Sequence, residues 1–213
     1  MNTQNLVGAF KWTTNFNVAL NQGKVTDIQG QVIEGGVGNM NRVQEGYAIG
    51  VYYTAEWAGV DPANGNALWY KNTKNADGTI DRSTTSIFNQ ATRVVTGNPN
   101  PDVILGLTNS FSYKGFDMSI FFNGVLGNEN NIYGMGRYSS ASMRYEDNQT
   151  YDQMQRWQKP GDITNVPQAR FYVNNGAQIS SRYIVDGSYI RLRTVSLGYT
   201  FDSKKLNKLK LEK

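Results

Sequence analysis

The residue types that most often perform catalysis are scarce in this 213-residue chain. It has no cysteine and no histidine, which excludes a disulfide framework, a thiolate nucleophile and an imidazole base. Carboxylates are close in sequence at Glu146-Asp147 and Asp152, but nothing there places two carboxyl groups across a cleft, as glycoside hydrolysis requires. We therefore expect solvated loop charges, no enzyme activity and no cofactor.

One segment has oxygen-bearing side chains at a spacing typical of calcium loops. In residues 75–81, NADGTID, they stand at alternate positions, but the bidentate glutamate of an EF-hand is missing. A hairpin turn at Ala76-Asp77-Gly78 explains the same residues. We predict the turn and no metal, with a calcium site as the alternative.

The formal net charge of +4 is concentrated near one end, because five of the 21 basic residues lie in segment 204–213. No basic stripe with interleaved aromatics runs through the rest, which argues against nucleic-acid binding. A mean hydropathy of −0.52, together with the lack of any run of about 18 apolar residues, excludes a membrane-spanning helix. It does not exclude a membrane β-barrel, whose strands alternate. The first residues lack the basic and apolar regions of a secretory signal peptide.

Alternation of apolar and polar residues dominates the chain and predicts an all-β, antiparallel meander. The pattern predicts strands near 8–20, 47–59, 103–114, 116–127 and 188–201, and the start of a sixth strand at Leu209 and Leu211. The clearest hairpin turns at Lys114-Gly115, where glycine reaches positive φ freely.

The predicted strands are long and their connections unequal. Twelve residues span roughly 40 Å, enough to cross a bilayer when tilted. A two-residue turn contrasts with long loops at 60–102 and 128–187, as in outer-membrane barrels with short periplasmic turns and long extracellular loops. This favours part of a large transmembrane β-barrel over a β-sandwich or soluble barrel with an aromatic core face.

A periplasmic turn at Lys114-Gly115 sets the orientation of both faces. Five aromatic residues would then lie at one height on the lipid-facing side as an interfacial girdle: Tyr47, Tyr113, Phe116, Tyr199 and Phe201. The opposite, lumen-facing side would carry Lys11, Asn15, Asn17, Thr108, Ser110, Ser112, Asp117 and Asn123.

Two arginines break this pattern. Arg191 and Arg193 share the parity of the apolar Val195 and Leu197, and a charge at mid-membrane costs roughly 2–4 kcal/mol. We expect either that they lie beyond the bilayer or that a β-bulge exchanges the faces of the strand.

The long loops contain aromatic residues that could stack on a ligand or contact a partner. The candidates are Trp69, Tyr70, Tyr133, Tyr138 and Trp157. The alternative is that these rings pack the loops against themselves.

Three segments resemble one known family. DGSYIRLRTVSLGYTF (186–201) is similar to the near-C-terminal strand of SusC/RagA-type TonB-linked outer-membrane proteins of the Bacteroidetes. NPNPDVILGLTNSFSYKGFDMSIFFNGVLGN (98–128) resembles the hairpin before it, and GYAIGVYYTAEWAGVDPANGNALWY (46–70) resembles the strand and loop preceding that hairpin. The resemblance covers the chain from about Phe10 to Leu211.

The resemblance implies a C-terminal-region fragment of a barrel transporter gated by a plug and driven by TonB in the cell outer membrane. Its partner would be a SusD-like surface lipoprotein, its ligand an oligosaccharide or peptide, and its surroundings membrane lipid. The signal peptide and plug would lie outside these 213 residues. The alternative function is a soluble all-β carbohydrate-binding or adhesin module.

Overall fold

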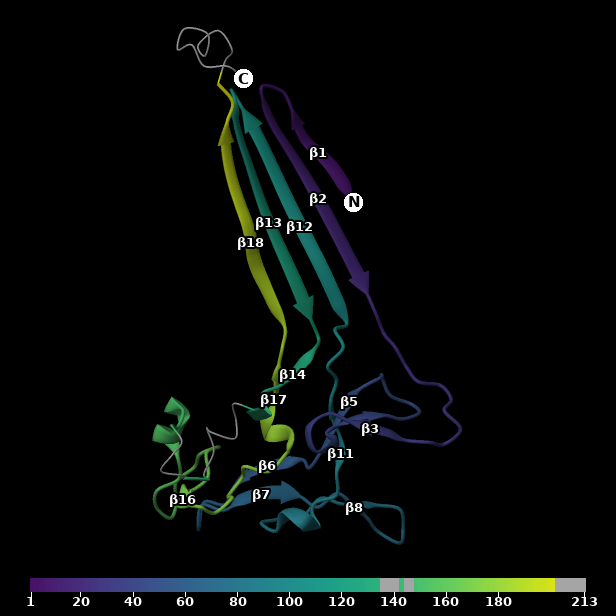
Figure 1. Cartoon of the computed structure of the whole chain (residues 1–213), viewed down its shortest axis with the longest axis vertical. Helices are drawn as coiled ribbons and strands as arrows, with labels where there is room; N and C mark the ends of the chain where they lie inside the picture. Colours follow the sequence, from purple (N-terminus) through teal and green to yellow (C-terminus); the bar gives the residue numbers. More distant parts are fainter. Residues whose placement is uncertain (135–141, 144–147, 202–213) are drawn as a thin grey trace. The chain divides into compact units, whose positions relative to one another are not determined.

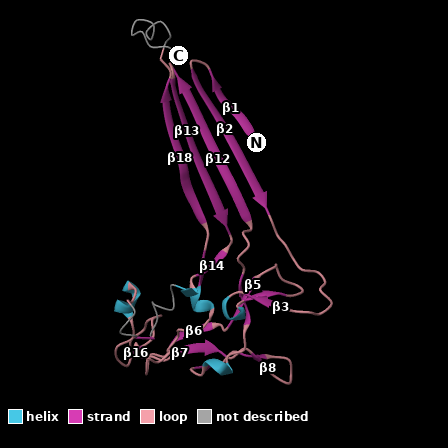
Figure 2. Cartoon of the chain, in the orientation of Figure 1, coloured by secondary structure: helices cyan, strands magenta, loops and turns pink. Residues whose placement is uncertain are grey.

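A computed structural model of the chain describes residues 1–134, 142–143 and 148–201. The described chain is β-structure apart from short 3-10 turns and the α-helical residues 133–134 (Figure 2). No helix in the described chain is long and apolar enough to cross a membrane. Its strands fall into two compact units, each built from segments distant in sequence.

The first unit is one antiparallel sheet built from residues 1–22, 101–128 and the chain from residue 187 (Figure 1). Its strand order is β1-β2-β12-β13-β18. The strands are β1 (Asn2–Val7), β2 (Phe10–Leu20), β12 (Val103–Tyr113), β13 (Phe116–Leu126) and β18 (Tyr189–Tyr199). The last four lie within the ranges that the alternation predicts, whereas the polar β1, sequence NTQNLV, shows no such alternation and was not predicted.

The turn between β12 and β13 has the backbone that its sequence predicts. Lys114 and Gly115 have φ values of 47° and 84°, the two positive values of the I′ turn whose twist suits a hairpin. A Cβ on Gly115 would lie 2.8 Å from the carbonyl oxygen of Thr200, so glycine is also needed for close approach.

The second unit contains residues 23–100 and 129–186. Its strands form a sheet β10-β7-β6, a sheet β11-β5-β4-β3, and the pairs β14-β17, β15-β16 and β8-β9. The strands and short helices are β3 (Ile33–Gly35), η1 (Val37–Asn39), β4 (Asn41–Val43), β5 (Val51–Thr54), β6 (Trp57–Val60), β7 (Ala67–Tyr70), β8 (Thr73–Lys74), β9 (Ile80–Asp81), β10 (Thr84–Thr85), η2 (Phe88–Gln90), β11 (Val94–Gly97), β14 (Glu129–Asn131), β15 (Ser142–Met143), η3 (Tyr151–Gln155), β16 (Arg170–Phe171), η4 (Ser181–Tyr183) and β17 (Ile184–Asp186).

The hydrophobic core of the second unit is aromatic. Ala55, Ala67 and Trp69 are its buried centre. The ring of Trp69 meets Trp57 at 5.9 Å and Phe88 at 5.2 Å between centroids, both edge to face, the geometry that aromatic quadrupoles favour.

The predicted single strand over 47–59 is wrong. The structure has two short strands there, β5 and β6, which belong to different sheets. Gly50 and Gly59 have φ values of 78° and 109°, which interrupt an extended chain. The connection between β2 and β12 is therefore longer than the predicted loop 60–102, because residues 23–100 all belong to the second unit.

The long sheet has two edge strands, β1 and β18, so the described chain shows an open antiparallel sheet rather than a closed barrel. The expected sixth strand at Leu209 and Leu211 lies outside the described residues.

Candidate functional site

The pairing register places the apolar residues of four strands on one face of the long sheet. β2 pairs with β12, β12 with β13 and β13 with β18, and directly opposed residues point to the same side. Phe16, Leu107, Phe122 and Leu192 form one such row of successive partners. This face is half-exposed on the central strands and exposed on the edge strand, where Leu197 is 73% exposed. No second layer of described residues buries it as a sandwich would.

One end of this face carries a row of aromatic rings. Phe10, Tyr113, Phe116 and Tyr199 are successive partners on β2, β12, β13 and β18. The rings of Phe116 and Tyr199 lie 4.5 Å apart, and Phe201 lies 4.9 Å from Tyr199. Amphipathic rings at one level are suited to a membrane interface. We call these five residues the aromatic row.

The aromatic row differs from the predicted girdle in one member. Tyr47 belongs to the second unit and to none of the long strands, so its assignment to the sheet was wrong. Phe10 takes the position instead, opposite Tyr113. The alternation in 8–20 places Phe10 on the apolar face, but its level depends on the pairing of β2 with β12, which alternation does not reveal.

A β-bulge resolves the arginine conflict in β18. Phe121 pairs with Thr194 and Phe122 with Leu192, so Arg193 is the additional residue. Beyond the bulge Arg191 pairs with Asn123 on the polar face, and Leu192 joins the apolar face. Of the two explanations that the sequence offers, the bulge is confirmed.

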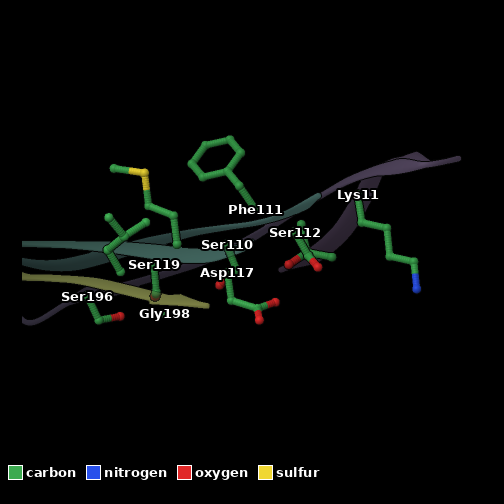
Figure 3. Close-up of a pocket in the computed structure, with 11 residues that line it drawn as sticks. Lys11, Ser110, Phe111, Ser112, Asp117, Ser119, Ser196 and Gly198 are labelled. Carbon is green, nitrogen blue, oxygen red and sulfur yellow. The ribbon is translucent and has the colours of Figure 1, made fainter. Parts of the chain in front are cut away.

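The opposite face of the sheet is polar and lined by small residues. Thr13, Ser110, Ser119 and Ser196 are successive partners across four strands. Together with Lys11, Ser112 and Asp117 they line a shallow depression of about 510 Å³. Figure 3 shows Phe111 on one side of the sheet and Ser110, Asp117 and Ser196 on the other. The depression offers hydroxyl groups and one charge of each sign to water or to a polar chain.

On the polar face, a glycine within β12 lies close to a side chain of β2. A Cβ on Gly106 would lie 2.5 Å from the side-chain oxygen of Asn17, its partner on β2. The predicted lumen-facing residues Asn15 and Thr108 are likewise direct partners, so the register brings the predicted polar set together.

Two predicted ligand-contact residues are buried. Trp69 is 2% exposed within the core, and Trp157 is 5% exposed. The indole N–H of Trp157 donates to the carbonyl oxygen of Pro62 at 3.0 Å, and its ring occupies the space that a Cβ on Gly65 would need. Both tryptophans therefore hold the second unit together and present no ring face to a ligand.

The other predicted contact residues are less buried. The guanidinium of Arg82 lies 4.1 Å from the ring centroid of Tyr70, so one face of that ring is covered. Tyr133 is half-buried against Tyr183, at 5.5 Å between centroids. Tyr138 lies outside the described residues.

The exposed aromatics of the second unit were not among the selected candidates. Tyr151 is 83% exposed and Phe171 is 62% exposed. Arg170, before Phe171, donates to the side-chain oxygen of Asn66 at 2.6 Å. Asn175 donates to the carbonyl oxygens of Gly65 and Gln168, both at 2.9 Å. Polar anchors thus hold the loop that presents Phe171, and sequence spacing gives no signal of such distant contacts.

The calcium-like segment is a hairpin turn, as predicted. The Asp77 carboxylate accepts hydrogen bonds from the backbone N–H and the hydroxyl of Thr79, and these bonds lower its pKa. β8 and β9 pair on either side of it. In the part of the chain that the structure describes, no group of three or more acidic residues is arranged to hold a metal ion.

Among the described residues, a network of charged and amide groups lies beside Tyr70. The Arg82 guanidinium donates to both carboxylate oxygens of Glu56, at 2.6 and 2.9 Å, and to the side-chain oxygen of Asn72 at 2.6 Å. The Asn72 amide donates to Glu56 at 3.0 Å. Hydrogen bonding from Arg82 lowers the pKa of Glu56, and the same pair raises the pKa of Arg82. The network holds these charges together within the second unit.

Comparison with known proteins relates this fold to one class. The chain superposes on the structure of the RagAB peptide transporter with a TM-score of 0.75 at 20% identity, covering 93% of this chain and 22% of that one. The RagAB peptide importer in its open-open state gives 0.78 at 19% identity, covering 96% and 22%. These likenesses show the fold, antiparallel β-sheet aligned with part of a large barrel protein. No protein-family model matches.

Sequence relatives then identify the family. TonB-dependent receptor P3 of Formosa agariphila is 30% identical over 226 residues, covering all of this chain and 22% of the relative. TonB-dependent receptor P26 of the same organism is 28% identical, and TonB-dependent receptor SusC of Bacteroides thetaiotaomicron is 24% identical, covering 97% and 91% of this chain. The chain belongs to the TonB-dependent receptors of SusC/RagA type. It spans about a fifth of the length of these curated relatives.

TonB-dependent receptors sit in the bacterial outer membrane and are transporters rather than enzymes. That class agrees with the scarcity of catalytic residue types noted in the sequence.

Proposed function

We propose that this chain supplies wall strands and external loop structure to an outer-membrane TonB-dependent transporter that imports a peptide or oligosaccharide. The five strands of the first unit form an arc of the barrel, and the second unit forms the external structure. In the complete transporter, ligand capture outside would precede a TonB-driven rearrangement of the plug and passage through the lumen.

The two faces of the long sheet carry this proposal. One face of β2, β12, β13 and β18 is apolar, uncovered and edged by the aromatic row, while the other presents hydroxyl, amide and charged groups. A water-filled barrel in lipid requires this arrangement, because its strands alternate lipid-facing and lumen-facing residues. The matches to TonB-dependent receptors favour this function over the soluble carbohydrate-binding or adhesin module.

The partner and ligand are proposed from the relatives. The RagAB structures are of a peptide transporter, which supports a peptide ligand and a SusD-like surface lipoprotein as partner. An oligosaccharide is the other ligand class that the resemblance of the sequence motifs implies, and TonB-dependent receptor SusC is among the relatives of the chain. Within this chain, Tyr70, Tyr133 and the exposed Tyr151 and Phe171 supply partly open aromatic surface for contact with ligand or partner, and Tyr138 stays a prediction.

A growth experiment tests the transport function. The gene for a full-length receptor carrying this sequence is deleted from its host in frame, and growth is measured on defined peptides or oligosaccharides as the limiting nutrient. We expect loss of growth on one of these two classes, restored by the intact gene. Equal growth of the deletion strain on every peptide and oligosaccharide that the wild type uses would contradict the proposal.

A further inference from the structure

The register between β2 and β12 is not set by a turn. β12 and β13 are joined by Lys114-Gly115, which fixes their pairing. β2 ends at Leu20 and β12 begins at Val103, with residues of the second unit between them. A slip of two residues would keep every side chain on its present face, so alternation alone does not forbid it.

A polar network on the apolar face connects these two strands at the observed register. The side-chain oxygen of Asn109 accepts a hydrogen bond from the indole N–H of Trp12 at 2.9 Å and from the hydroxyl of Thr14 at 2.7 Å. The amide of Asn5, on β1, donates to the Thr14 hydroxyl at 2.7 Å. Thr14 is the direct partner of Asn109. In the described strands, no other side-chain hydrogen bond joins β2 to β12.

We propose that Asn109 fixes the register of β2 against β12. A slip of two residues would place Asn109 opposite Trp12 or Phe16 and separate it from the Thr14 hydroxyl. This inference rests on the proposed function, in which the apolar face lies against lipid. No water is present there to replace a lost hydrogen bond. A single polar residue on an apolar seam selects one register in the same way in coiled coils.

The network also explains why an amide interrupts an otherwise apolar strand. Asn109 lies between Leu107 and Phe111 on the apolar face, at a position where leucine would suit lipid better. Its three neighbours in the network come from β1 and β2, the strands whose placement no short turn to β12 determines. The amide therefore lies where β12 meets a strand whose register is not determined by a short turn.

Engineered disulfides test the proposal in a full-length receptor carrying this sequence, isolated from the outer membrane. Cysteine replaces Thr13 on β2 together with one residue of β12. Ser110→Cys reports the native register, because Thr13 and Ser110 are partners, whereas Thr108→Cys or Ser112→Cys reports a slip of two residues. The pairs lie on the polar face, away from the network, and the chain has no cysteine of its own.

We expect Asn109→Leu to raise the ratio of slipped to native cross-links roughly tenfold, because two membrane hydrogen bonds are lost. The double variant Trp12→Phe, Thr14→Val removes the two hydrogen-bond donors and should raise the cross-link ratio to the same extent. It tests the proposal even if Asn109→Leu fails to assemble. Leu107→Val, a substitution on the same face without a hydrogen bond, should leave the ratio unchanged.

Native cross-links alone in Asn109→Leu and in the double variant would overturn the proposal. That result would leave the proposed function intact if the variants still support import. A wild-type receptor that does not reach the outer membrane would instead contradict the proposed function, so the two failures are distinguishable.

Discussion

Glu56 and Arg82 form a pair whose strength depends on pH. Because hydrogen bonding from Arg82 lowers the pKa of Glu56, the stability that the pair contributes is present above the ordinary pKa of a glutamate. It is lost as the pH falls through the lowered value. Both side chains are partly exposed, so solvent screens the interaction and the effect is small.

Glu56→Gln should therefore remove part of the acid sensitivity of the second unit. We expect the melting temperature near neutral pH to fall by roughly 2 °C, with the difference from wild type vanishing in strong acid. Thermal unfolding followed by tryptophan fluorescence, at a series of pH values, measures both. A constant difference at every pH would show that Glu56 acts through packing rather than charge.

The packing of the second unit leaves no space for a side chain at Gly65. It has a φ of 71°, and a Cβ there would lie 2.6 Å from the Trp157 ring and 2.7 Å from the Cβ of Gln168. Gly78 has a similar φ of 86° but open space around the same position. Substitutions at these two glycines can therefore be compared: both introduce backbone strain, but only the one at Gly65 also introduces steric overlap.

Gly65→Ala should destabilise the second unit by roughly 3 kcal/mol and Gly78→Ala by roughly 1 kcal/mol, because overlap adds to left-handed strain only at Gly65. Urea titration followed by tryptophan fluorescence gives the free energy of unfolding of each variant. Equal losses at both positions would mean that Trp157 moves aside without cost.

At the scale of elements, the bulge in β18 determines which side of the sheet its charges occupy. Arg193 is the additional residue, so its deletion leaves Leu192 opposite Phe122 and Arg191 opposite Asn123, as now. Deletion of Leu192 also removes the bulge but places Arg193 opposite Phe122, on the apolar face. The two variants differ mainly in one exposed charge.

We expect deletion of Arg193 to allow assembly in the outer membrane, and deletion of Leu192 to reduce it, because an arginine near the bilayer midplane costs roughly 2–4 kcal/mol. Heat-modifiable migration of the receptor in gels measures the folded fraction. Equal assembly of both deletion variants would contradict a lipid-facing position for Leu192.

The long strands could be predicted because alternation is a local signal. β2, β12 and β13 each alternate between a mainly apolar and a mainly polar side over eleven residues, and β18 alternates in the same way on either side of its bulge. The strand predicted over 47–59 failed because β5 is buried on both sides, so its apolar residues report a packed interior rather than a lipid face. Tyr47 was assigned to the girdle as the first residue of that predicted strand, but it lies before β5 and is 43% exposed.

The candidate site was only partly predictable because its decisive contacts are distant in sequence. Trp69 and Trp157 were predicted to contact a ligand, but both are buried. Trp69 packs against Phe88 and Trp157 against Gly65, and sequence spacing does not predict either contact. The aromatic row was predicted except for Phe10, whose level is set by pairing with Tyr113. The bulge at Arg193 was inferable since apolar residues change parity around it.

At the scale of the whole molecule, the chain spans about a fifth of the length of the receptors that it resembles. Under the proposed function, the long sheet would act as an arc of wall, with its polar face inside and its apolar face outside, once further strands close the barrel. The ligand and the SusD-like partner are accordingly properties proposed for the complete transporter.

The central claim is that alternate residues of β12 face lipid and lumen. Single cysteines at positions 105 to 112 of a full-length receptor carrying this sequence, each bearing a spin label, measure this directly. We expect collision with oxygen to be high at Leu105, Leu107 and Phe111, and collision with a water-soluble nickel complex to be high at Thr108, Ser110 and Ser112. Equal access of the nickel complex to both sets would contradict the account.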